Sequence, residues 1–436
     1  MGGVFVSWPT VPHRPRRRGA GGINSAEVRV LLIGTGGREH ALAQSLASDP
    51  AVDVLICAPG NPGMATLGEL RSVNAADPHA VSALAVEVEA DLVVVGPEAP
   101  LVAGVADAVR AKGISCFGPS AAAARIEGSK AFAKGIMAAA GVPTARSRLC
   151  RTDAEACAAL DEFGAPYVVK DDALAAGKGV VVTDDRQAAL RHAMACDAVV
   201  IEEYLSGPEV SLFVVTDGRT AVPLLPAQDF KRLGDGDEGP NTGGMGAYTP
   251  LPWAPAGLVE DIVKQVANPT LARLADDGEP FIGALYCGVA LTPDGIKVIE
   301  FNCRFGDPEI QSVLALLETP LAGLLHAAAD GTLADHPPLQ WRDGAAVTVV
   351  QAASGYPDRP VGGHEIHGAE EPGVFQAGTA RTPDGRLLTA GGRVLNLTAA
   401  GADLAAARQA VYELAERVGF AGAQFRTDIA QDAAEV

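Results

Sequence analysis

The sequence has no cysteine pair at motif spacing, no long apolar run and no excess of basic charge. Its seven cysteines are odd in number and include no Cys-x-x-Cys, which argues against a disulfide framework and indicates reduced thiols in a cytoplasmic protein. No apolar run reaches the roughly 18 residues that span a bilayer. The net charge is −19, whereas a general binder of nucleic-acid backbones needs clustered Lys and Arg. Neither nucleic acid nor a membrane is therefore an expected partner.

What is present is a chain of 436 residues, 48% hydrophobic and 20% charged, which suffices for about three or four domains with sizeable cores. Residues 1–27 differ from the rest, because they hold several Arg, Gly and Pro residues and no acid before Glu27. That composition cannot bury a core, so a disordered basic extension is expected, with a nucleic-acid arm or a targeting peptide as the alternative.

Short apolar strands followed by loops rich in Gly and Pro open the regular part of the chain. They alternate with helical patterns, which predicts a parallel sheet with right-handed crossovers. Ligands bind such sheets beyond the carboxyl ends of the strands, where all of these loops lie. The strands are expected at Val28–Ile33, Val54–Cys57, Leu92–Val95 and Ile114–Phe117.

The first loop, Gly34-Thr35-Gly36-Gly37, begins a dinucleotide fingerprint but has Glu39 in place of the third glycine. A nicotinamide oxidoreductase is therefore a disfavoured alternative. Backbone amides of a glycine turn at a helix start, beside Arg38, suit one phosphate monoester. A tight turn that needs glycine only for packing is the other interpretation.

Two lysines and a second glycine loop mark the middle of the chain. Lys130 opens a helix and Lys170 ends a strand. Residues 171–179 lead into another strand at Val180–Thr183, which predicts a hairpin with an Ala/Gly-rich tip and not a phosphate loop before a helix. Such a tip can close over nucleotide phosphates, and the lysines can equally be exposed surface charges.

An acidic edge follows the strand expected at Val199–Ile201. Glu202 and Glu203 come where that strand emerges, and Glu209 follows a glycine turn. Carboxylates placed in this way suit hydrogen bonds to an adenine amino group and to ribose hydroxyls. A charged surface turn explains the pattern nearly as well.

The most informative stretch reads Ile-Glu-Phe-Asn-Cys-Arg-Phe-Gly-Asp-Pro-Glu, at residues 299–309. Alternation in a strand over Lys297–Phe305 places four residues on one face: Val298, Glu300, Asn302 and Arg304. Oxygen donors two residues apart lie roughly 6.5 Å apart along a strand, so Glu300 and Asn302 suit one hard cation, with Arg304 facing its phosphate. An ordinary half-exposed strand is the competing interpretation.

Six short motifs stand in order along the chain: Gly34-x-Gly36-Gly37-Arg38-Glu39-His40, Gly96-Pro97-Glu98-x-Pro100-Leu101, Glu127-Gly128-Ser129-Lys130, Leu174-Ala175-Ala176-Gly177-Lys178-Gly179, Asn241-Thr242-Gly243-Gly244-Met245-Gly246-Ala247-Tyr248 and Glu300-Phe301-Asn302-x-Arg304-Phe305-Gly306-Asp307-Pro308-Glu309. Each alone is weak to moderate. Together they closely resemble the phosphoribosylamine-glycine ligase (glycinamide ribonucleotide synthetase) family, from about Val28 to Asp428.

This resemblance implies a multidomain α/β and α+β protein with the ATP-grasp fold, a parallel, Rossmann-like N-terminal domain and a small C-terminal α+β domain. It implies ATP-dependent ligation of glycine to 5-phosphoribosylamine through glycyl phosphate, in the second step of de novo purine biosynthesis. ATP is then a substrate and Mg²⁺ or Mn²⁺ the cofactor. Another ATP-grasp carboxylate-amine ligase of purine metabolism is the closest alternative, and a non-catalytic nucleotide-binding regulator is a more distant one.

The same resemblance sets the expected domains. They are a substrate domain at 28–125, an ATP-grasp lid subdomain at 126–212, an ATP-grasp core subdomain at 213–344 and the C-terminal domain at 345–436. Strands at Val347–Gln351, Val374–Gly378 and Gly392–Leu397 and a helix from Leu404 to Val418 are expected in the last. A monomer or weak homodimer in the cytoplasm is expected.

Site residues carry over from the family position by position. ATP would be bound by Lys130, Lys170, Gly177, Lys178, Gly179, Glu202, Glu203, Tyr204, Leu205 and Glu209. Glu300 and Asn302 would be the metal ligands, and Arg304 the catalytic residue. Phosphoribosylamine would be bound by Gly36, Gly37, Arg38, Gly60, Asn61 and Glu98. Glycine and the acyl phosphate would lie against Asp229, Lys231, Arg232, Gly244 and Met245.

Two positions depart from the family pattern. The lid has Ala173 where the family has glycine, which reduces access to positive φ. The strand before the metal site supplies only apolar residues at Gly288–Leu291, which leaves the number of metal ions open.

Overall fold

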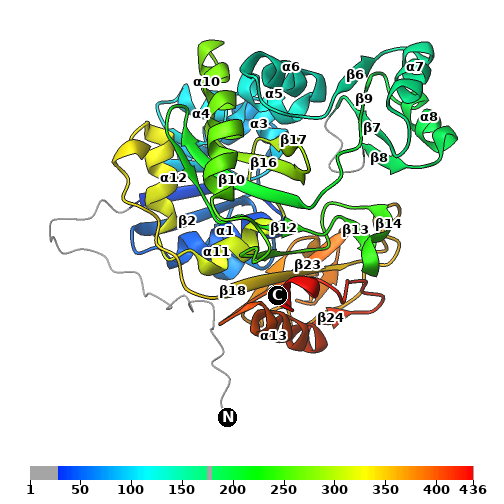
Figure 1. Cartoon of the computed structure of the whole chain (residues 1–436). Helices are drawn as coiled ribbons and strands as arrows, with labels where there is room; N and C mark the ends of the chain where they lie inside the picture. The colour runs from blue at the N-terminus through cyan, green and yellow to red at the C-terminus, as the bar shows by residue number, and fades with distance from the viewer. Residues whose placement is uncertain (1–27, 174–178, 436) are drawn as a thin grey trace, which may run out of the picture.

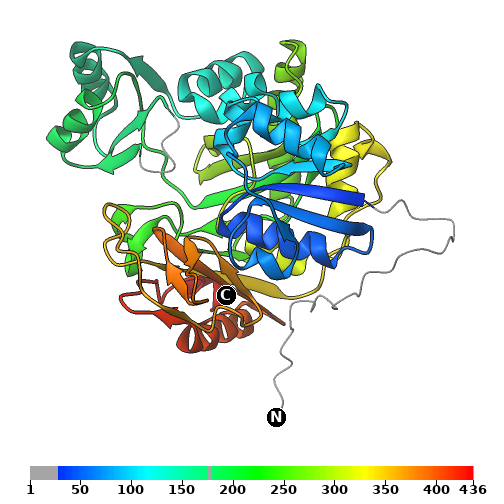
Figure 2. The same cartoon turned by 180° about the vertical axis from the view of Figure 1, so that it is seen from behind.

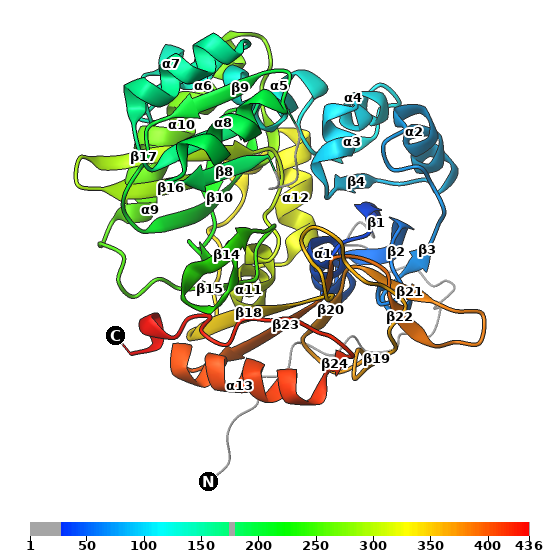
Figure 3. The same ribbon diagram turned by 90° about the vertical axis from the view of Figure 1, so that its right-hand side faces the viewer.

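The computed structural model describes residues 28–173 and 179–435. Figure 1 shows a central body, a smaller subdomain of β6–β9 with α7 and α8 that projects at the upper right, and a C-terminal domain below. The N-terminal domain lies on the other side and faces the viewer in Figure 2. Figure 3 shows these three parts arranged around the core subdomain of β10, β16 and β17.

The N-terminal domain is an all-parallel sheet of order β3-β2-β1-β4-β5. The strand β1 is apolar throughout its buried length, as a parallel strand covered on both faces must be. The predicted parallel sheet is therefore confirmed. Its strands are β1 (Val28–Gly34), β2 (Val52–Pro59), β3 (Glu69–Leu70), β4 (Leu92–Val95) and β5 (Ser115–Phe117), with helices α1 (Gly37–Ser48), η1 (Met64–Thr66), α2 (Pro78–Glu87), α3 (Glu98–Val102) and α4 (Val105–Arg110).

The projecting subdomain is an antiparallel sheet of order β6-β9-β7-β8 with its own small apolar core. The expected hairpin is confirmed, because β7 and β8 pair antiparallel from Tyr167↔Thr183 to Lys170↔Val180. The elements are β6 (Ser147–Cys150), α7 (Asp153–Phe163), β7 (Tyr167–Asp171), β8 (Val180–Thr183), α8 (Arg186–Met194) and β9 (Val199–Glu202).

The expected lid range of 126–212 is wider than this sheet. Helices α5 (Ala121–Gly128) and α6 (Lys130–Ala140) pack into the main core, not the lid core. The boundary after residue 212 falls inside β10 (Glu209–Asp217), which pairs with β16 along its whole length. The structure therefore separates lid from core between β9 and β10.

The core subdomain contains an antiparallel sheet of order β11-β10-β16-β17. Helices α11 and α12 pack with residues of β10 and β16 and complete the central apolar core. Its further elements are β11 (Ala221–Pro223), α9 (Leu258–Ile262), the π-helical turn η3 (Val263–Ala267), α10 (Asn268–Asp276), β16 (Ile282–Thr292), β17 (Gly295–Asn302), α11 (Glu309–Leu316), α12 (Leu321–Asp330) and η4 (Leu333–Asp335).

The predicted face of β17 is wrong in one respect. Between Val298↔Val289 and Glu300↔Gly288 the register shifts, which leaves Ile299 as the extra residue of a β-bulge. Val298 therefore lies in the core with Phe301 and Cys303, opposite to Glu300 and not beside it. The strand also ends at Asn302 and not at Phe305.

The C-terminal domain shares its antiparallel sheet, of order β12-β15-β18-β23-β20, with two strands from the preceding region. Helix α13, capped by Asp403, covers this sheet and buries Leu404, Val411 and Leu414. The expected α+β domain is confirmed. Its elements are β12 (Gln228–Asp229), β15 (Gly246–Thr249), β18 (Ala345–Ala352), β19 (Ile366–His367), β20 (Val374–Gln376), β21 (Thr379–Arg381), β22 (Leu387–Thr389), β23 (Arg393–Gly401), α13 (Leu404–Arg417), β24 (Gly419–Phe420) and η5 (Asp432–Ala434).

A small hairpin next to this sheet consists of β13 (Arg232–Gly234), η2 (Asp235–Asp237) and β14 (Glu238–Asn241). The buried Arg426 guanidinium ties it to the C-terminal end of the chain through Asp237 and Asp428, 2.6 Å from each.

Within the described residues, no helix is both long and apolar enough to cross a membrane.

Candidate active site

The end of β17 carries the predicted acid and amide pair. Glu300 lies opposite Gly288 of β16, where an added Cβ would come within 3.3 Å of the Glu300 Cγ and 2.9 Å of the Tyr286 ring. Glycine at that position therefore makes room for both side chains. Glu300 and Asn302 share the face of the strand that points away from the core, as the alternation predicts.

Four cations surround the Glu300 carboxylate. Burial alone would raise its pKa, yet the pKa is lowered, because the positive charges of Lys231, Lys170, Lys130 and Arg304 favour the ionised form. These residues come from four separate segments of the chain. The fold thus brings together the predicted metal ligand, the predicted phosphate-binding lysines and the predicted catalytic arginine.

Lys170 lies at the base of the lid sheet with its ammonium group turned into the protein. Its Nζ forms an ion pair with Glu202 and donates a 2.9 Å hydrogen bond to the carbonyl of Ile299, the bulged residue beside Glu300. Lys134 approaches the second oxygen of Glu202 at 2.7 Å. Glu202 therefore has a buried carboxylate between two lysines, and sequence reasoning missed one of them.

The other residues of the expected nucleotide edge lie in the loop between β9 and β10. Glu203 turns outward, where Arg146 donates to it at 2.7 Å and Lys297 lies 3.9 Å away. Tyr204 is half exposed, and Leu205 is partly buried. Glu209, at the start of β10, accepts a 2.7 Å hydrogen bond from Lys231.

Lys130 and Gly179 frame the hairpin tip. Asp172 caps α6 by accepting hydrogen bonds from Ser129 Oγ at 3.0 Å and from the Ala131 N–H at 2.9 Å. Lys130, the first residue of that helix, reaches the Ala173 carbonyl at 3.3 Å. The Gly179 carbonyl accepts from Asp171 N–H at 2.7 Å. The predicted lid residues Gly177 and Lys178 lie outside the described residues.

Lys231 and Asp229 meet the site from β12 and its neighbouring loop. Lys231 Nζ lies 2.7 Å from Glu209 and 3.8 Å from Glu300, so it links the expected ribose and metal positions. Its pKa is raised, because these acids outweigh the effect of burial. Asp229 Oδ1 is buried with no hydrogen-bond partner among the described residues, and burial together with Glu309 raises the Asp229 pKa. An unpaired carboxylate oxygen of this kind suits an ammonium group.

Gly244 and Met245 occupy the loop beside Asp229, but in different ways. Gly244 has φ +106°, and an added Cβ would lie 2.7 Å from Asp229 Oδ1, so the loop requires glycine there. Arg232 donates from the adjacent hairpin to the Gly239 carbonyl at 2.8 Å and does not contact this loop. The Met245 side chain is fully buried against Ala352 and Tyr356. The Met245 backbone N–H donates to the Phe230 carbonyl at 2.8 Å and its carbonyl accepts from Val350 at 2.9 Å, so in this arrangement Met245 serves the fold.

Arg304 is held between two acids. Its Nη2 lies 2.8 Å from Glu127, at the end of α5, and its Nε lies 3.2 Å from Glu98, at the start of α3. Burial would lower the guanidinium pKa, but Glu127 and Glu98 raise it, so the charge is permanent. Glu98, expected to bind phosphoribosylamine, thus also orients Arg304, the predicted catalytic residue. Glu127 lay in a quoted motif but was given no role.

The glycine turn before α1 is satisfied by its own side chains. The Gly36 N–H donates to Glu39 Oε2 at 2.7 Å, and the Arg38 N–H donates to Asp307 Oδ2 at 3.3 Å. The Arg38 guanidinium pairs with Glu39 and donates to the Phe305 carbonyl at 3.0 Å. Gly37 packs against Asn396. The backbone N–H groups expected to bind a phosphate thus donate to carboxylates of the protein itself. In this arrangement the turn fits the other interpretation given above, in which glycine is needed only for packing.

Asn61 has no free hydrogen-bonding group either. Its amide nitrogen donates to the carbonyls of Thr35 and Gln376 at 2.8 and 2.7 Å, and its oxygen accepts from Gly63 and Met64. Gly60, at φ +71°, turns the chain so that this can happen. All four bonding positions of the Asn61 side chain are used within the fold, so a substrate contact by the Gly60-Asn61 turn stays a prediction that this side chain does not support in this arrangement.

Sequence reasoning also missed a junction of three domains at Asp307. Besides Arg38 of the N-terminal domain, Asp307 accepts from Gln311 at 2.9 Å and from Asn396 of β23 at 2.6 Å. Arg393 of β23 reaches the Asp307 carboxylate at 3.5 Å and donates to the carbonyls of Gly243 and Gly244. The C-terminal domain thus supplies two side chains to the site, and no local pattern in the sequence distinguishes them.

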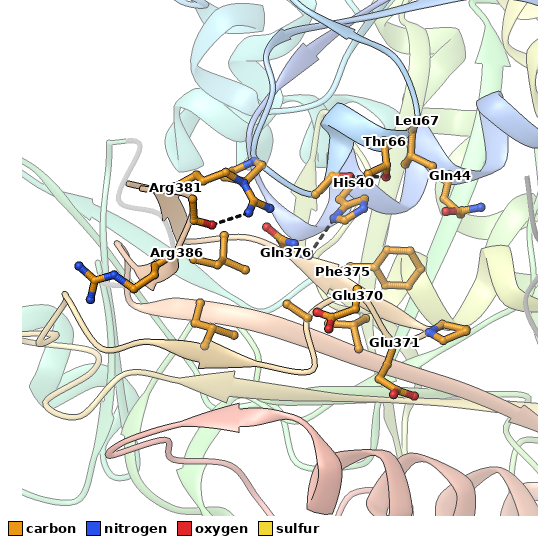
Figure 4. Close-up of a pocket in the computed structure, with 18 of the residues that line it drawn as sticks. His40, Gln44, Thr66, Leu67, Glu370, Glu371, Phe375, Gln376, Arg381 and Arg386 are labelled. Atoms are coloured by element: carbon orange, nitrogen blue, oxygen red, sulfur yellow. Dashed lines mark hydrogen bonds between the residues drawn. The ribbon is translucent and has the colours of Figure 1, made fainter. Parts of the chain in front are cut away.

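A cavity of about 770 Å³ lies apart from this cluster and between the N- and C-terminal domains. Figure 4 shows His40 at its wall, with Phe375 beside it and Arg381 and Arg386 toward one end. Its lining contains none of the predicted site residues. His40 Nδ1 accepts from the Gln376 N–H at 2.8 Å, and burial lowers the His40 pKa to about 4. We regard this cavity as part of the domain interface.

The donors at the centre fit a magnesium-type ion. Glu300 and Asn302 offer hard oxygen ligands, and no cluster of three or more His, Cys, Asp or Glu side chains that could hold a metal occurs in the described part of the chain. Mg²⁺ is commonly bound by one or two carboxylates together with substrate phosphates and water. A pair of protein ligands beside phosphate-binding lysines matches that mode.

The structure has a lid sheet separate from the core sheet, and the facing ends of the two sheets bring cations together around Glu300 and Asn302. This arrangement is that of the ATP-grasp class of enzymes. Similarity of fold agrees: a biotin carboxylase domain of Hydrogenobacter thermophilus 2-oxoglutarate carboxylase superposes with a TM-score of 0.69 at 16% identity, covering 92% of each chain. At that identity the likeness concerns the fold alone.

The family is narrower than the class. Models of phosphoribosylglycinamide synthetase match the N domain at residues 28–127, the ATP-grasp (A) domain at 128–310 and the C domain at 346–432. The chain belongs to the phosphoribosylamine-glycine ligase family. The expected fold class and activity are thereby confirmed: the enzyme uses ATP to join glycine to 5-phosphoribosylamine in the second step of purine biosynthesis.

Individual relatives agree along nearly the whole chain. The phosphoribosylamine-glycine ligase of Streptomyces coelicolor is 61% identical over 415 residues, covering 93% of this chain and all of the relative. That of Mycobacterium bovis is 57% identical over 417 residues, covering 94% and 99%. The crystal structure of the Thermotoga maritima ligase superposes with a TM-score of 0.81 at 34% identity, covering 92% of this chain and all of that one.

Proposed function

We propose that the convergence on Glu300 is the catalytic centre, where the glycine carboxylate attacks the γ-phosphate of ATP and glycyl phosphate forms. The observation that carries this is the placement of the Glu300 carboxylate, whose side chain is about a third exposed and lies 3.8 Å from Lys231 Nζ. Against the effect of burial, its pKa is lowered by Lys231, Lys170, Lys130 and Arg304. A carboxylate that attacks a polyanionic nucleotide meets charge repulsion, which fixed cations offset. Four positive groups around one acid give the site that capacity.

ATP would lie between the lid sheet and the core sheet. Lys130 and Lys170 would contact its phosphates, and the backbone of Glu202 to Leu205 would contact adenine. Glu209, now paired with Lys231, would accept from a ribose hydroxyl. Glu300 and Asn302 would hold Mg²⁺ or Mn²⁺, which supplies charge neutralisation between the phosphates.

Glycine would bind beside β12. The unpaired, buried Asp229 oxygen would accept from its ammonium group, and Lys231 would orient its carboxylate. Transfer of the γ-phosphoryl group to a glycine oxygen releases ADP. The amine of phosphoribosylamine then attacks the acyl carbon, inorganic phosphate leaves and the nitrogen loses a proton. Arg304 would stabilise the negative charge on the transferring group or on the tetrahedral oxyanion.

Phosphoribosylamine would approach from the N-terminal domain, where Glu98 contacts Arg304. Because the amides of the Gly36 turn are occupied, its 5-phosphate would require other donors or a rearrangement of Glu39. The roles of Gly36, Gly37, Arg38 and Gly60 in substrate binding stay predictions.

One assay tests the substrate assignment: ADP formation with glycine and freshly prepared phosphoribosylamine, each omitted in turn. We expect continuous ADP release only when both substrates are present. Glycine alone should give at most a single-turnover burst. Turnover that persists without glycine would overturn the assignment in favour of another carboxylate-amine ligase.

We further propose a monomer or weak homodimer located in the cytoplasm. All seven cysteines are free thiols and five of them are buried, which is typical of a reducing compartment. Analytical ultracentrifugation over a range of concentrations measures the oligomeric state, and a stable tetramer would contradict the proposal.

A further inference from the structure

Three charged side chains at the base of the lid sheet lie together, and one of them, Lys134, has no role among those proposed above. Glu202 and Lys170 are about 5% exposed or less, and Lys134 lies beneath them on α6. Lys134 Nζ lies 2.7 Å from one Glu202 oxygen, and Lys170 Nζ pairs with the other. One carboxylate is thus shared by two ammonium groups.

The two lysines differ in what else holds them. Lys134 also donates to Thr144 Oγ1 at 3.0 Å and to the Ala145 carbonyl at 2.9 Å, so two of its hydrogens have fixed acceptors in addition to its ion pair with Glu202. Among the described residues, Lys170 has the Ile299 carbonyl as its one hydrogen-bond acceptor besides its ion pair with Glu202. Lys134 is therefore anchored by groups away from the nucleotide, whereas Lys170 is held at the edge of the phosphate site.

Charge balance gives this difference a consequence. A buried carboxylate that loses its partner costs several kcal/mol, since the remaining charge is left uncompensated. If Lys170 were the sole partner of Glu202, any movement toward a phosphate would incur that cost. With Lys134 in place, Glu202 stays paired while Lys170 reorients, and the group as a whole carries one surplus positive charge.

We propose that Lys134 is a positioning residue that keeps Glu202 paired and so frees the Lys170 ammonium group for the nucleotide phosphate. This inference rests on the proposed role of Lys170 in phosphate binding. Lys134 itself does not touch the nucleotide. Burial, opposed by Glu202, lowers the Lys134 pKa, in keeping with its enclosed place.

The test compares two ligands that differ only in their phosphates. In the full-length Lys134→Met variant, calorimetry should show ADP binding weakened about 10-fold, a difference of about 1.4 kcal/mol. Adenosine affinity should stay within about 2-fold, because adenosine has no phosphate for Lys170 to reach. The KM for ATP should rise with the ADP dissociation constant, while the KM for glycine stays unchanged.

Two controls separate charge from packing. Lys134→Arg keeps a positive charge beside Glu202 and should restore most of the ADP affinity. Lys264→Met removes an exposed lysine far from the group and should leave both affinities unchanged. Thermal unfolding of every variant checks that the fold survives.

A double-mutant cycle tests whether Lys134 acts through Glu202. In a Glu202→Gln background there is no carboxylate to hold, so Lys134→Met should add little further loss of ADP affinity. Additive losses, or equal weakening of ADP and adenosine, would overturn the inference and leave Lys134 with a structural role only.

Lys170→Met distinguishes this failure from a failure of the proposed function. If Lys170→Met weakens ADP binding and Lys134→Met does not, only the positioning role is wrong. If Lys170→Met leaves ADP affinity unchanged, the phosphate role of Lys170 fails, and the inference fails with it.

Discussion

The turn before α1 and the end of β17 both place polar residues where a strand stops, yet their side chains are used differently. At the turn, Glu39 and Asn61 satisfy backbone groups of their own domain and the C-terminal domain. At β17, Glu300 is surrounded by four cations, and Asp229 nearby keeps an unpaired oxygen. The polar side chains of the turn region are therefore used in hydrogen bonds within the protein, whereas the end of β17 has charged groups available for a ligand.

This difference shows that a motif rich in Gly and polar residues does not reveal by itself where a ligand binds. Buried polar groups in proteins are nearly always paired, so an unpaired or overcompensated group marks a site. The two regions therefore predict opposite phenotypes. Changes at β17 should reduce turnover with the fold intact, and changes at the turn should reduce stability.

The largest effect is expected for Glu300→Gln. Loss of the negative charge removes a proposed metal ligand while keeping the size of the side chain, so ADP release should fall by about 1,000-fold. The melting temperature should change little. Glu260→Gln, on the exposed side of α9, is the matched control. Normal turnover of Glu300→Gln would contradict the proposed metal-binding role and, with it, the difference drawn between the two regions.

His40 should give the turn region a dependence of stability on pH. Its pKa in the folded protein is about 4, below the ordinary 6.5, because burial disfavours the charged ring. The unfolded chain therefore binds the extra proton first, and stability falls as the pH drops from about 6.5 to 4, by up to about 3 kcal/mol. Urea unfolding at several pH values measures this loss.

His40→Asn should remove most of that pH dependence, because Asn can accept from Gln376 without titrating. The exposed His79→Asn is the control and should leave the pH profile unchanged. If the unfolding free energy of His40→Asn depends on pH as steeply as that of the wild type, other titratable groups cause the effect.

Arg304→Lys should lower kcat by about 100-fold. Lysine keeps the charge but cannot donate to Glu127 and Glu98 with the same planar geometry. Steady-state kinetics with glycine and phosphoribosylamine measures the loss. A change confined to KM would indicate that Arg304 only binds a substrate.

Asn61→Ala should have the smallest effect on turnover but a clear one on the fold. Removing its four hydrogen bonds leaves buried backbone groups unpaired and should cost about 2 kcal/mol of unfolding free energy. The KM for phosphoribosylamine should stay unchanged at a temperature where the variant is folded. A raised KM with unchanged stability would restore the substrate role first expected of Asn61.

Local patterns predicted most of the fold. The buried apolar run of β4 was placed to the residue, and the hairpin of β7 and β8 followed from two β-rich runs around a Gly-rich tip. The bulge at Ile299 was not predictable, because it depends on pairing with β16. A single inserted residue reversed the face of Val298 while Glu300 stayed where the alternation placed it.

The site was predictable where its chemistry lies in contiguous motifs. Glu300, Asn302 and Arg304 stand within five residues, so a strand alone brings them near one another. Arg393, Asn396 and Lys134 were missed, since none of them stands in a motif with a recognisable chemical role. Their roles depend on partners that lie far away in the sequence.

The sequence by itself determined the family, the order of the elements and the residue types that the reaction requires, because these follow from short motifs and local periodicity. Only the tertiary structure decided which polar groups are free. Hydrogen bonds and ion pairs are satisfied by whichever atoms come within about 3 Å, and long-range contacts set that distance. Thus the side chains of Glu39 and Asn61 are satisfied within the fold, while Glu300 lies among cations and Asp229 keeps an unpaired oxygen among the described residues.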